Sequence, residues 1–326
     1  MIEKDLRRKQ ASDKKGAFTL LEILVAAAVL SVMLVFLFSA FTHTSAVWKR
    51  SSDKIESFQQ ARAAFDVLRQ TLSQATLNTY LDYDNANNPK RYLRQSELRF
   101  VTGPAGGALP GTSGTGQAIF YQTPTGYSAS SQYAGLENLL NTCGFYVQFT
   151  TNNLVPPHVT STANPYRYRL MQLMVPSEQN SIYTASGNSW FSTATNAIPV
   201  ADNVIALIIR PQDPATATNS PALAPNDSYS YDSTANATAN PQPITANQLP
   251  PVIQVTLVAV DEASARRLEA GNAQPADITQ ALAGRFLNPS QFESDLEQVS
   301  QSLSDKKINH RIFSSTVPLR ESKWTK

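Results

Sequence analysis

The residue types that most often carry chemistry are few in this chain and lie far apart. Among 326 residues there is one cysteine, Cys143, and there are three histidines, His43, His158 and His310. A single cysteine forms no intrachain disulfide, and histidines at this spacing match no zinc-finger or paired-histidine metal motif. No G-x-S-x-G motif is present either, so we expect Cys143 to be a small buried thiol rather than a nucleophile.

A glycine-rich segment imitates a phosphate-binding loop without completing it. Residues 106–113 read G-G-A-L-P-G-T-S, which has the glycine spacing of a Walker A motif. The lysine that contacts the phosphates in such a loop is replaced by Thr112. We therefore expect an ordinary glycine-rich loop and no nucleotide or other cofactor.

Asp82 and Asp84 begin a segment that resembles the start of a calcium-binding loop. An EF-hand loop also needs an oxygen ligand, a glycine at its turn and a bidentate glutamate. The residues at those places are Ala86, Asn87 and Leu93. The sequence favours a turn that ends a helix at residues 82–89 and predicts no metal centre, with an irregular calcium site as the alternative.

The charges are balanced overall but unevenly placed. The chain has 27 Lys and Arg against 25 Asp and Glu, which excludes a charge-driven nucleic-acid binder, and no nucleic-acid partner is expected. The first 17 residues alone carry a net charge of +3, which is typical of a targeting leader. A second basic group near the C-terminus is interpreted as a solvated face, and its members are Lys306, Lys307, His310, Arg311, Arg320, Lys323 and Lys326.

Directly after the leader comes a segment that can span a bilayer. Residues 23–48 contain no Asp, Glu, Lys or Arg, and 26 helical residues cover roughly 39 Å against a hydrocarbon core of about 30 Å. Because the basic residues precede this segment, they are expected to stay cytoplasmic and to place the chain after about residue 48 on the far side. Glu22 lies inside the apolar run, where a carboxylate is costly. It is either functional or an interfacial side chain that reaches water.

The leader and the residues around Glu22 carry a resemblance. Residues 14–22 read K-K-G-A-F-T-L-L-E and resemble the class III signal of type IV pilins and type II secretion pseudopilins. The resemblance implies that a prepilin peptidase cuts after a small residue and methylates the new N-terminal amine. A cut after Ala17 makes Phe18 the first residue and Glu22 the fifth, as in the family. A cut after Gly16 makes Glu22 the sixth, and we favour Ala17.

The resemblance also implies an assembly role for the first mature residues. In the family, the methylated amine of a neighbouring subunit is the partner of the glutamate carboxylate. Here that partner is the amine of Phe18. A buried unpaired charge costs several kcal/mol, so pairing with Glu22 would fix the axial register between subunits.

Helical periodicity continues beyond the apolar segment. Apolar residues recur at helical spacing at Ile55, Phe58, Phe65, Leu68 and Leu72, which predicts one face packed on a globular domain. We expect a transmembrane and assembly helix over residues 18–48 and its periplasmic continuation over residues 49–80, ending near residue 77. The alternative is a break near residue 49 followed by a separate amphipathic helix.

Residues 81–326 are expected to form the globular head. Strands are predicted by β-branched and aromatic runs between turn residues, and the strand at 166–175 is expected to have one wet face because it carries Arg167 and Arg169. A segment rich in Pro, Ala, Thr and Asn at about residues 211–251 is interpreted as a disordered surface loop. The predicted strands are 97–101, 118–123, 144–150, 166–175, 200–209, 252–260 and 311–319, and the predicted short helices are 261–270, 277–287 and 289–303.

Together these features predict an α+β, pilin-like fold: a long N-terminal helix packed on a mostly antiparallel β-sheet head. Segments at 136–147, 253–260 and 313–320 resemble the minor pseudopilin J class and, more closely, the Verru_Chthon cassette protein C family. This resemblance implies a non-enzymatic subunit of a type II secretion-type pseudopilus or its tip complex. It would lie in the bacterial inner membrane with a cytoplasmic leader (1–17) and a periplasmic head, and prepilin peptidase, other pseudopilins and membrane lipid would be its partners. The alternatives are a minor pilin of a surface type IV pilus and a signal-anchored periplasmic enzyme or binding domain.

Overall fold

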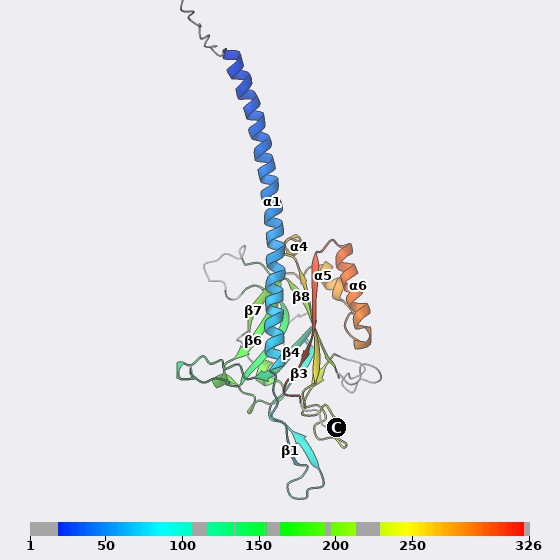
Figure 1. The fold of residues 1–326 in the computed structure, drawn as a ribbon. Helices are drawn as coiled ribbons and strands as arrows, with labels where there is room; N and C mark the ends of the chain where they lie inside the picture. Colours follow the sequence, from blue (N-terminus) through cyan, green and yellow to red (C-terminus); the bar gives the residue numbers. More distant parts are fainter. Residues whose placement is uncertain are drawn as a thin grey trace, which may run out of the picture. The chain divides into compact units, whose positions relative to one another are not determined.

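The computed structural model describes residues 19–105, 116–133, 135–152, 154, 164–192, 197–212 and 229–322, without the side chains of residues 46 and 49–57. The chain divides into two compact units, residues 1–52 and 53–326. The first unit is helical where it is described, and the second combines helices with antiparallel sheets (Figure 1). The predicted α+β class is confirmed.

The longest element is helix α1, Leu20–Ser73, with 54 residues. Helical backbone continues through residue 49, so the alternative of a break there is wrong. In the described part of the chain, α1 is the one helix long and apolar enough to cross a membrane, over Leu20–Ser45. None of that segment is buried within the chain, because its apolar side chains point outward all round.

Within the second unit, α1 buries one face. Of the predicted apolar face, Phe58, Phe65, Leu68 and Leu72 are buried, while the side chain of Ile55 lies outside the described part. The helix ends earlier than the predicted residue 77. Its last turn tightens, and the backbone N–H of Thr76 then donates to the carbonyl of Gln122 (2.9 Å), which draws the chain into the sheet.

Two antiparallel sheets form the body of the second unit. Strand Val252–Val260 matches its prediction, whereas the single strand predicted at 200–209 is two strands in different sheets. They separate at Asn203, whose φ of 61° takes the backbone into the left-handed region and ends one strand before the next begins. The six-stranded sheet has the order β7 (Ala197–Asp202), β6 (Arg167–Val175), β5 (Asn141–Thr150), β4 (Gln117–Thr123), β3 (Val101–Pro104) and β9 (Tyr231–Asp232). The three-stranded sheet has the order β11 (His310–Pro318), β10 (Val252–Val260) and β8 (Val204–Gln212).

The three predicted short helices are present near their predicted places. Asp261 caps α4 (Glu262–Arg267) by accepting from the backbone N–H of Ser264 (2.9 Å). α5 spans Ala276–Leu282 and ends before residue 287, because Gly284 and Phe286 have positive φ. A 3₁₀ turn, Pro289–Gln291, leads into α6, Phe292–Asp305. The remaining short elements are α3 (Ser189–Ser192) and the 3₁₀ turns Ser131–Tyr133 and Ser177–Gln179.

The three-stranded sheet has α1 on one face and α6 on the other (Figure 1). The rings of Phe65 on α1 and Phe313 on β11 lie 6.1 Å apart. Ser300 on α6 bonds His310 at the start of β11 through its side chain (2.9 Å). Residues 310 and 313 are an odd number apart on one strand, so they point to opposite faces. Side chains from α1, both sheets and α6 contribute to one hydrophobic core.

Two predictions for residues 80–101 are wrong. The segment at 82–89 does not end a helix. It connects β1 (Tyr80–Tyr83) and β2 (Tyr92–Gln95), a two-stranded hairpin, and Asp84 holds the connection by accepting from the backbone N–H of Lys90 (2.9 Å). The strand predicted at 97–101 instead begins at Val101, where β3 pairs with β4.

The disordered loop predicted at 211–251 is also wrong where the structure describes it. Pro211 belongs to β8, and residues 213–228 lie outside the described part. From Tyr229 onward the segment is packed: Tyr229 and Tyr231 are buried, and the Tyr231 hydroxyl donates to the carbonyl of Gln248 (2.8 Å). Arg91 on the hairpin donates to the carbonyls of residues 238 and 239. Two buried tyrosines thus order a segment whose composition is otherwise that of a loop.

Candidate assembly site at the start of the apolar helix

The predicted assembly residue Glu22 lies in the first turn of α1 and bonds the residue just before the helix. The backbone N–H and the hydroxyl of Thr19 both donate to Glu22 Oε2, at 3.0 and 3.1 Å. In return the backbone N–H of Glu22 donates to Thr19 Oγ1 at 3.3 Å. This reciprocal arrangement is a capping box, which satisfies helix N–H groups that have no partner inside the helix.

The capping box has a chemical consequence for Glu22. Its carboxylate receives only neutral donors, and both of them reach the same oxygen. No ion pair joins Glu22 to a basic group among the described residues. The position of Glu22 at the helix N-terminus favours the negative charge of its carboxylate. A charged partner for that carboxylate must come from outside the described residues.

The other predicted site residues lie outside the described residues. Gly16, Ala17 and Phe18 directly precede Thr19, so their predicted roles in processing and assembly stay predictions. Thr19 is a functional candidate that our sequence reasoning missed. The spacing Thr-x-x-Glu in residues 19–22 is the sequence signature of a capping box and could have identified it.

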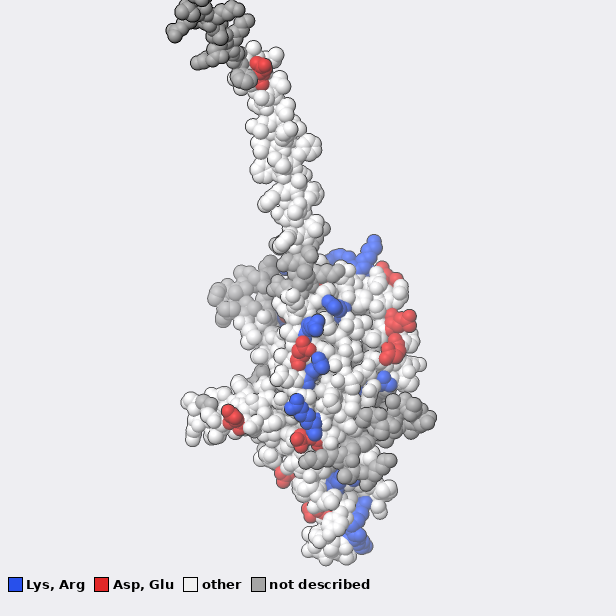
Figure 2. Space-filling model, viewed as in Figure 1, with Lys and Arg blue, Asp and Glu red and all other residues white. Residues whose placement is uncertain are grey.

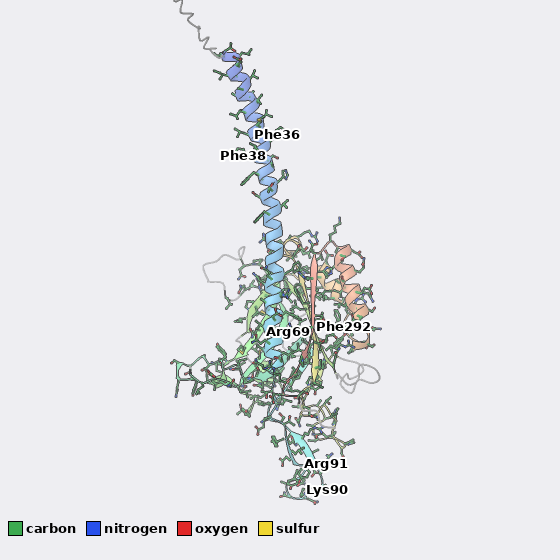
Figure 3. The ribbon with its side chains drawn as sticks, viewed as in Figure 1. Phe36, Phe38, Arg69, Lys90, Arg91 and Phe292 are labelled. Atoms are coloured by element: carbon green, nitrogen blue, oxygen red, sulfur yellow. The ribbon has the colours of Figure 1, made fainter. Side chains whose placement is uncertain are left out.

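The surface of the apolar helix suits contact with lipid or with other apolar helices. Phe36 and Phe38 have 70% and 67% of their surface exposed, and their neighbours in α1 are similarly exposed (Figure 3). The hydroxyl groups of Ser31 and Thr44 donate hydrogen bonds to the helix carbonyls four residues earlier, at 2.8 and 2.9 Å. These side chains therefore bring no unsatisfied donor into an apolar environment.

The head does not bring chemistry-bearing residues together where it is described. Cys143 is fully buried, as expected, and that burial raises the pKa of its thiol to about 11. No group of three metal-ligating side chains occurs among the described residues, and His158 lies outside them. His310 contacts Ser300 and the backbone of Ile308, which is a packing arrangement.

The wet face predicted for the strand at 166–175 is wrong. Arg167 and Arg169 are 6% and 2% exposed. Arg167 pairs with Glu269 at 2.9 Å, and Arg169 pairs with Asp202 at 2.8 Å. Desolvation lowers the pKa of Arg169, and the nearby Asp202 opposes that shift. These ion pairs connect β6 with β7 and with the segment after α4.

The family model that matches this chain covers its N-terminal segment. The family model of the prokaryotic N-terminal methylation motif matches residues 12–38, which include residues 16–18 and Glu22. Among solved structures, a type IV-like pilin from Thermus thermophilus aligns over 81% of this chain and 97% of its own, at 10% identity and a TM-score of 0.34, values that carry no functional conclusion. No curated protein matches the chain. The N-terminal segment thus carries a prokaryotic N-terminal methylation motif.

Proposed function

We propose that the chain is a structural subunit of a type II secretion-type pseudopilus or its tip complex, assembled through its N-terminal helix. The observation that carries the proposal is the Thr19–Glu22 capping box, which places a carboxylate at the start of an exposed apolar helix, with no charged partner among the described residues. The methylation motif at residues 12–38 supports it, because that motif surrounds the same residues.

The proposed mechanism begins with removal of the leader, residues 1–17. The cut after Ala17 exposes the amine of Phe18, one residue before the cap. When a subunit leaves the lipid for a filament, its Glu22 carboxylate loses access to water. A cation from the Phe18 amine of a neighbour then compensates that loss, and an unpaired carboxylate in such surroundings would cost several kcal/mol.

The proposed topology follows from charge and apolar length. The basic leader stays in the cytoplasm, residues 18–48 cross the inner membrane, and residues 49–80 continue toward a periplasmic head at 81–326. Prepilin peptidase, membrane lipid and other pilin-like subunits are the proposed partners. In this proposal the head contributes surfaces for assembly rather than a catalytic site.

The choice of a pseudopilus over a surface pilus rests on the resemblance of three body segments to the minor pseudopilin J class and to the Verru_Chthon cassette protein C family. A surface pilin would be recovered in fibres sheared from cells, whereas a pseudopilus subunit would remain with the cell envelope. A signal-anchored enzyme or binding domain would keep its activity when Glu22 is replaced.

Intact-mass measurement and N-terminal sequencing of the protein, from cells with and without prepilin peptidase, test the proposal. We expect a mature chain that begins with N-methylated Phe18 in cells with the peptidase and an uncut chain in cells without it. A chain that begins at Ala17 would move Glu22 to the sixth position and contradict the proposed pairing geometry. A chain that keeps residue 1 in both strains would overturn the proposal.

A further inference from the structure

A basic surface of the second unit is built from two segments that lie far apart in the sequence. Arg62, Asp66 and Arg69 follow one another at steps of four and three along an exposed face of α1. Arg311 near the start of β11 and Arg320 just after its end are both exposed. The basic residues near the C-terminus, which the sequence analysis interprets as one solvated face, therefore do not form a single group. Two of them, Arg311 and Arg320, lie on the same surface as the arginines of α1.

Contacts between α1 and β11 hold these residues on one surface. Phe313 packs on Phe65 of α1, and the guanidinium of Arg311 lies 5.6 Å from the Phe313 ring centre. The backbone N–H of Arg320 donates to the carbonyl of Ser73 at 3.3 Å. Between these two contacts a surface groove of about 330 Å³ runs along α1 and β11, with Arg69 and Arg320 in its lining. We call it the α1–β11 groove.

Of the four arginines on this basic surface, two of which line the groove, only Arg69 forms an ion pair among the described residues. Asp66 pairs with Arg69 at 3.2 Å, and both side chains remain about half exposed. Among the described residues, no ion pair is formed by Arg62, Arg311 or Arg320. Figure 2 shows Lys and Arg side chains over α1 and β11 in this view, with acidic side chains between some of them. The basic surface that contains the groove is therefore suited to an acidic partner.

The other side of the same sheet carries the opposite charge. α6 contains four acidic residues and no lysine or arginine. Glu293, Glu297 and Asp305 are exposed, and none of the three forms an ion pair within the described part of the chain. Acidic side chains lie over α6, at the right of the view (Figure 2). The sheet thus separates a basic groove on the α1 face from an acidic helix on the α6 face.

We propose that the α1–β11 groove binds α6 of a second copy of this chain, in a head-to-tail contact. A contact of two grooves would place arginines against arginines, whereas a groove and an α6 helix present opposite charges. A contact between different surfaces leaves one groove and one helix free at the ends, so it can repeat along a filament. The inference rests on the proposed function, because exposed ion pairs are weak and need the N-terminal helices to bring the heads together.

Cysteine cross-linking in full-length chains tests the contact. Gln70→Cys places a thiol at the groove and Gln298→Cys places one on the exposed side of α6. The native Cys143 is fully buried and does not compete. The two variants are produced on separately tagged copies in the same cells. After addition of an oxidant that accepts the two electrons, we expect a disulfide between the thiol introduced by Gln70→Cys in one copy and the thiol introduced by Gln298→Cys in the other, and no dimer of either variant alone.

Charge reversal with a matched control sharpens the test. Arg69→Glu with Arg320→Glu should lower the cross-linked fraction about tenfold, and adding Glu293→Arg with Glu297→Arg should restore it. Lys90→Glu, a reversal on the β1–β2 hairpin away from the groove, should leave the fraction unchanged (Figure 3). The cross-linked fraction should also fall as salt is raised.

Three outcomes would overturn the inference. Dimers of Gln70→Cys alone or of Gln298→Cys alone would show a symmetric contact. Absence of the mixed dimer in chains whose N-terminus is processed and whose assembly needs Glu22 would refute the head contact while leaving the proposed function intact. A mixed dimer that charge reversal does not change would show that the arginines and the acidic helix do not determine it.

Discussion

Two parts of α1 have the same backbone and opposite surroundings. From Leu20 to Ser45 the apolar side chains are exposed on every side of the helix, whereas from Phe58 to Leu72 they form one buried stripe. The first part has no polar face to turn toward water, so lipid or other apolar helices must cover it. The second part is amphipathic and is covered by its own sheets. In the proposed function, one helix serves assembly at its apolar end and folding of the head at the other.

The charged groups of the N-terminal segment and of the head also differ in whether they have partners within the chain. At the start of α1 the carboxylate of Glu22 is bonded by Thr19 alone, and its charge has no partner in the described chain. In the head, the charges that are buried have partners, as Arg169 has in Asp202. The buried ion pairs of the head are thus made within the head, whereas the charge of Glu22 finds no ionic partner among the described residues. This difference predicts which substitutions affect assembly and which affect folding.

The largest effect is expected for Glu22→Ala. Removing the carboxylate leaves the neighbour's amine without its partner when the helices associate, and an unpaired charge among apolar helices strongly disfavours assembly. Assembled material, measured by chemical cross-linking in cells, should fall below detection, while urea unfolding of the head should be unchanged. Glu22→Gln is the matched control for shape, and normal assembly of that variant would contradict a role for the charge.

A smaller effect, on the stability of the head rather than on assembly, is expected for Leu68→Ala. Leu68 is fully buried between α1 and the sheets, so truncation should lower the free energy of unfolding of the head by about 3 kcal/mol. Urea unfolding of the full chain in detergent, followed by tryptophan fluorescence to which the buried Trp190 contributes, measures this. Leu34→Ala, at an exposed position of the same helix, should leave the head's unfolding curve unchanged. An equal decrease in the free energy of unfolding for the two variants would contradict the different roles assigned to the two parts of α1.

The smallest effect is expected for Thr19→Val, which keeps the shape of the side chain and removes the hydroxyl. Loss of the cap should destabilise the first turn of α1 by about 1 kcal/mol and speed amide hydrogen exchange there. Assembly should be reduced only partly, because Glu22 remains. Thr19→Ser keeps a hydroxyl and should behave like the unaltered chain. A complete loss of assembly in Thr19→Val would contradict the claim that the cap only positions Glu22.

What the sequence could predict depended on how local each signal is. The charge-free run at 23–48 and the apolar spacing at Phe65, Leu68 and Leu72 are features of α1 alone, and the structure agrees with both. The prediction of strand β10 rests on its richness in β-branched residues and on the turn residues that bound it. Glu22 was singled out by its cost in an apolar run, which is also a local property.

The wrong predictions concern residues whose partners are distant in sequence. Arg167 and Arg169 looked like one wet face of a strand, but they are buried because Glu269 and Asp202 reach them from other elements. The segment after residue 228 looked like a loop, but Tyr231 packs it onto the sheet. The α1–β11 groove joins residues about 250 positions apart, so no local pattern could reveal it.

The most direct test of the central claim is to ask which amine lies against Glu22 in assembled chains. A carbodiimide activates a carboxylate and joins it to an amine in contact, with loss of water, so an amide bond records the pairing. With isotopically labelled and unlabelled copies assembled together, mass spectrometry tells links between copies from links within one copy. We predict an amide between Glu22 of one copy and the amine of Phe18 of another. A link within a single copy, or assembled chains in which Glu22 is linked to no N-terminal amine, would contradict the account.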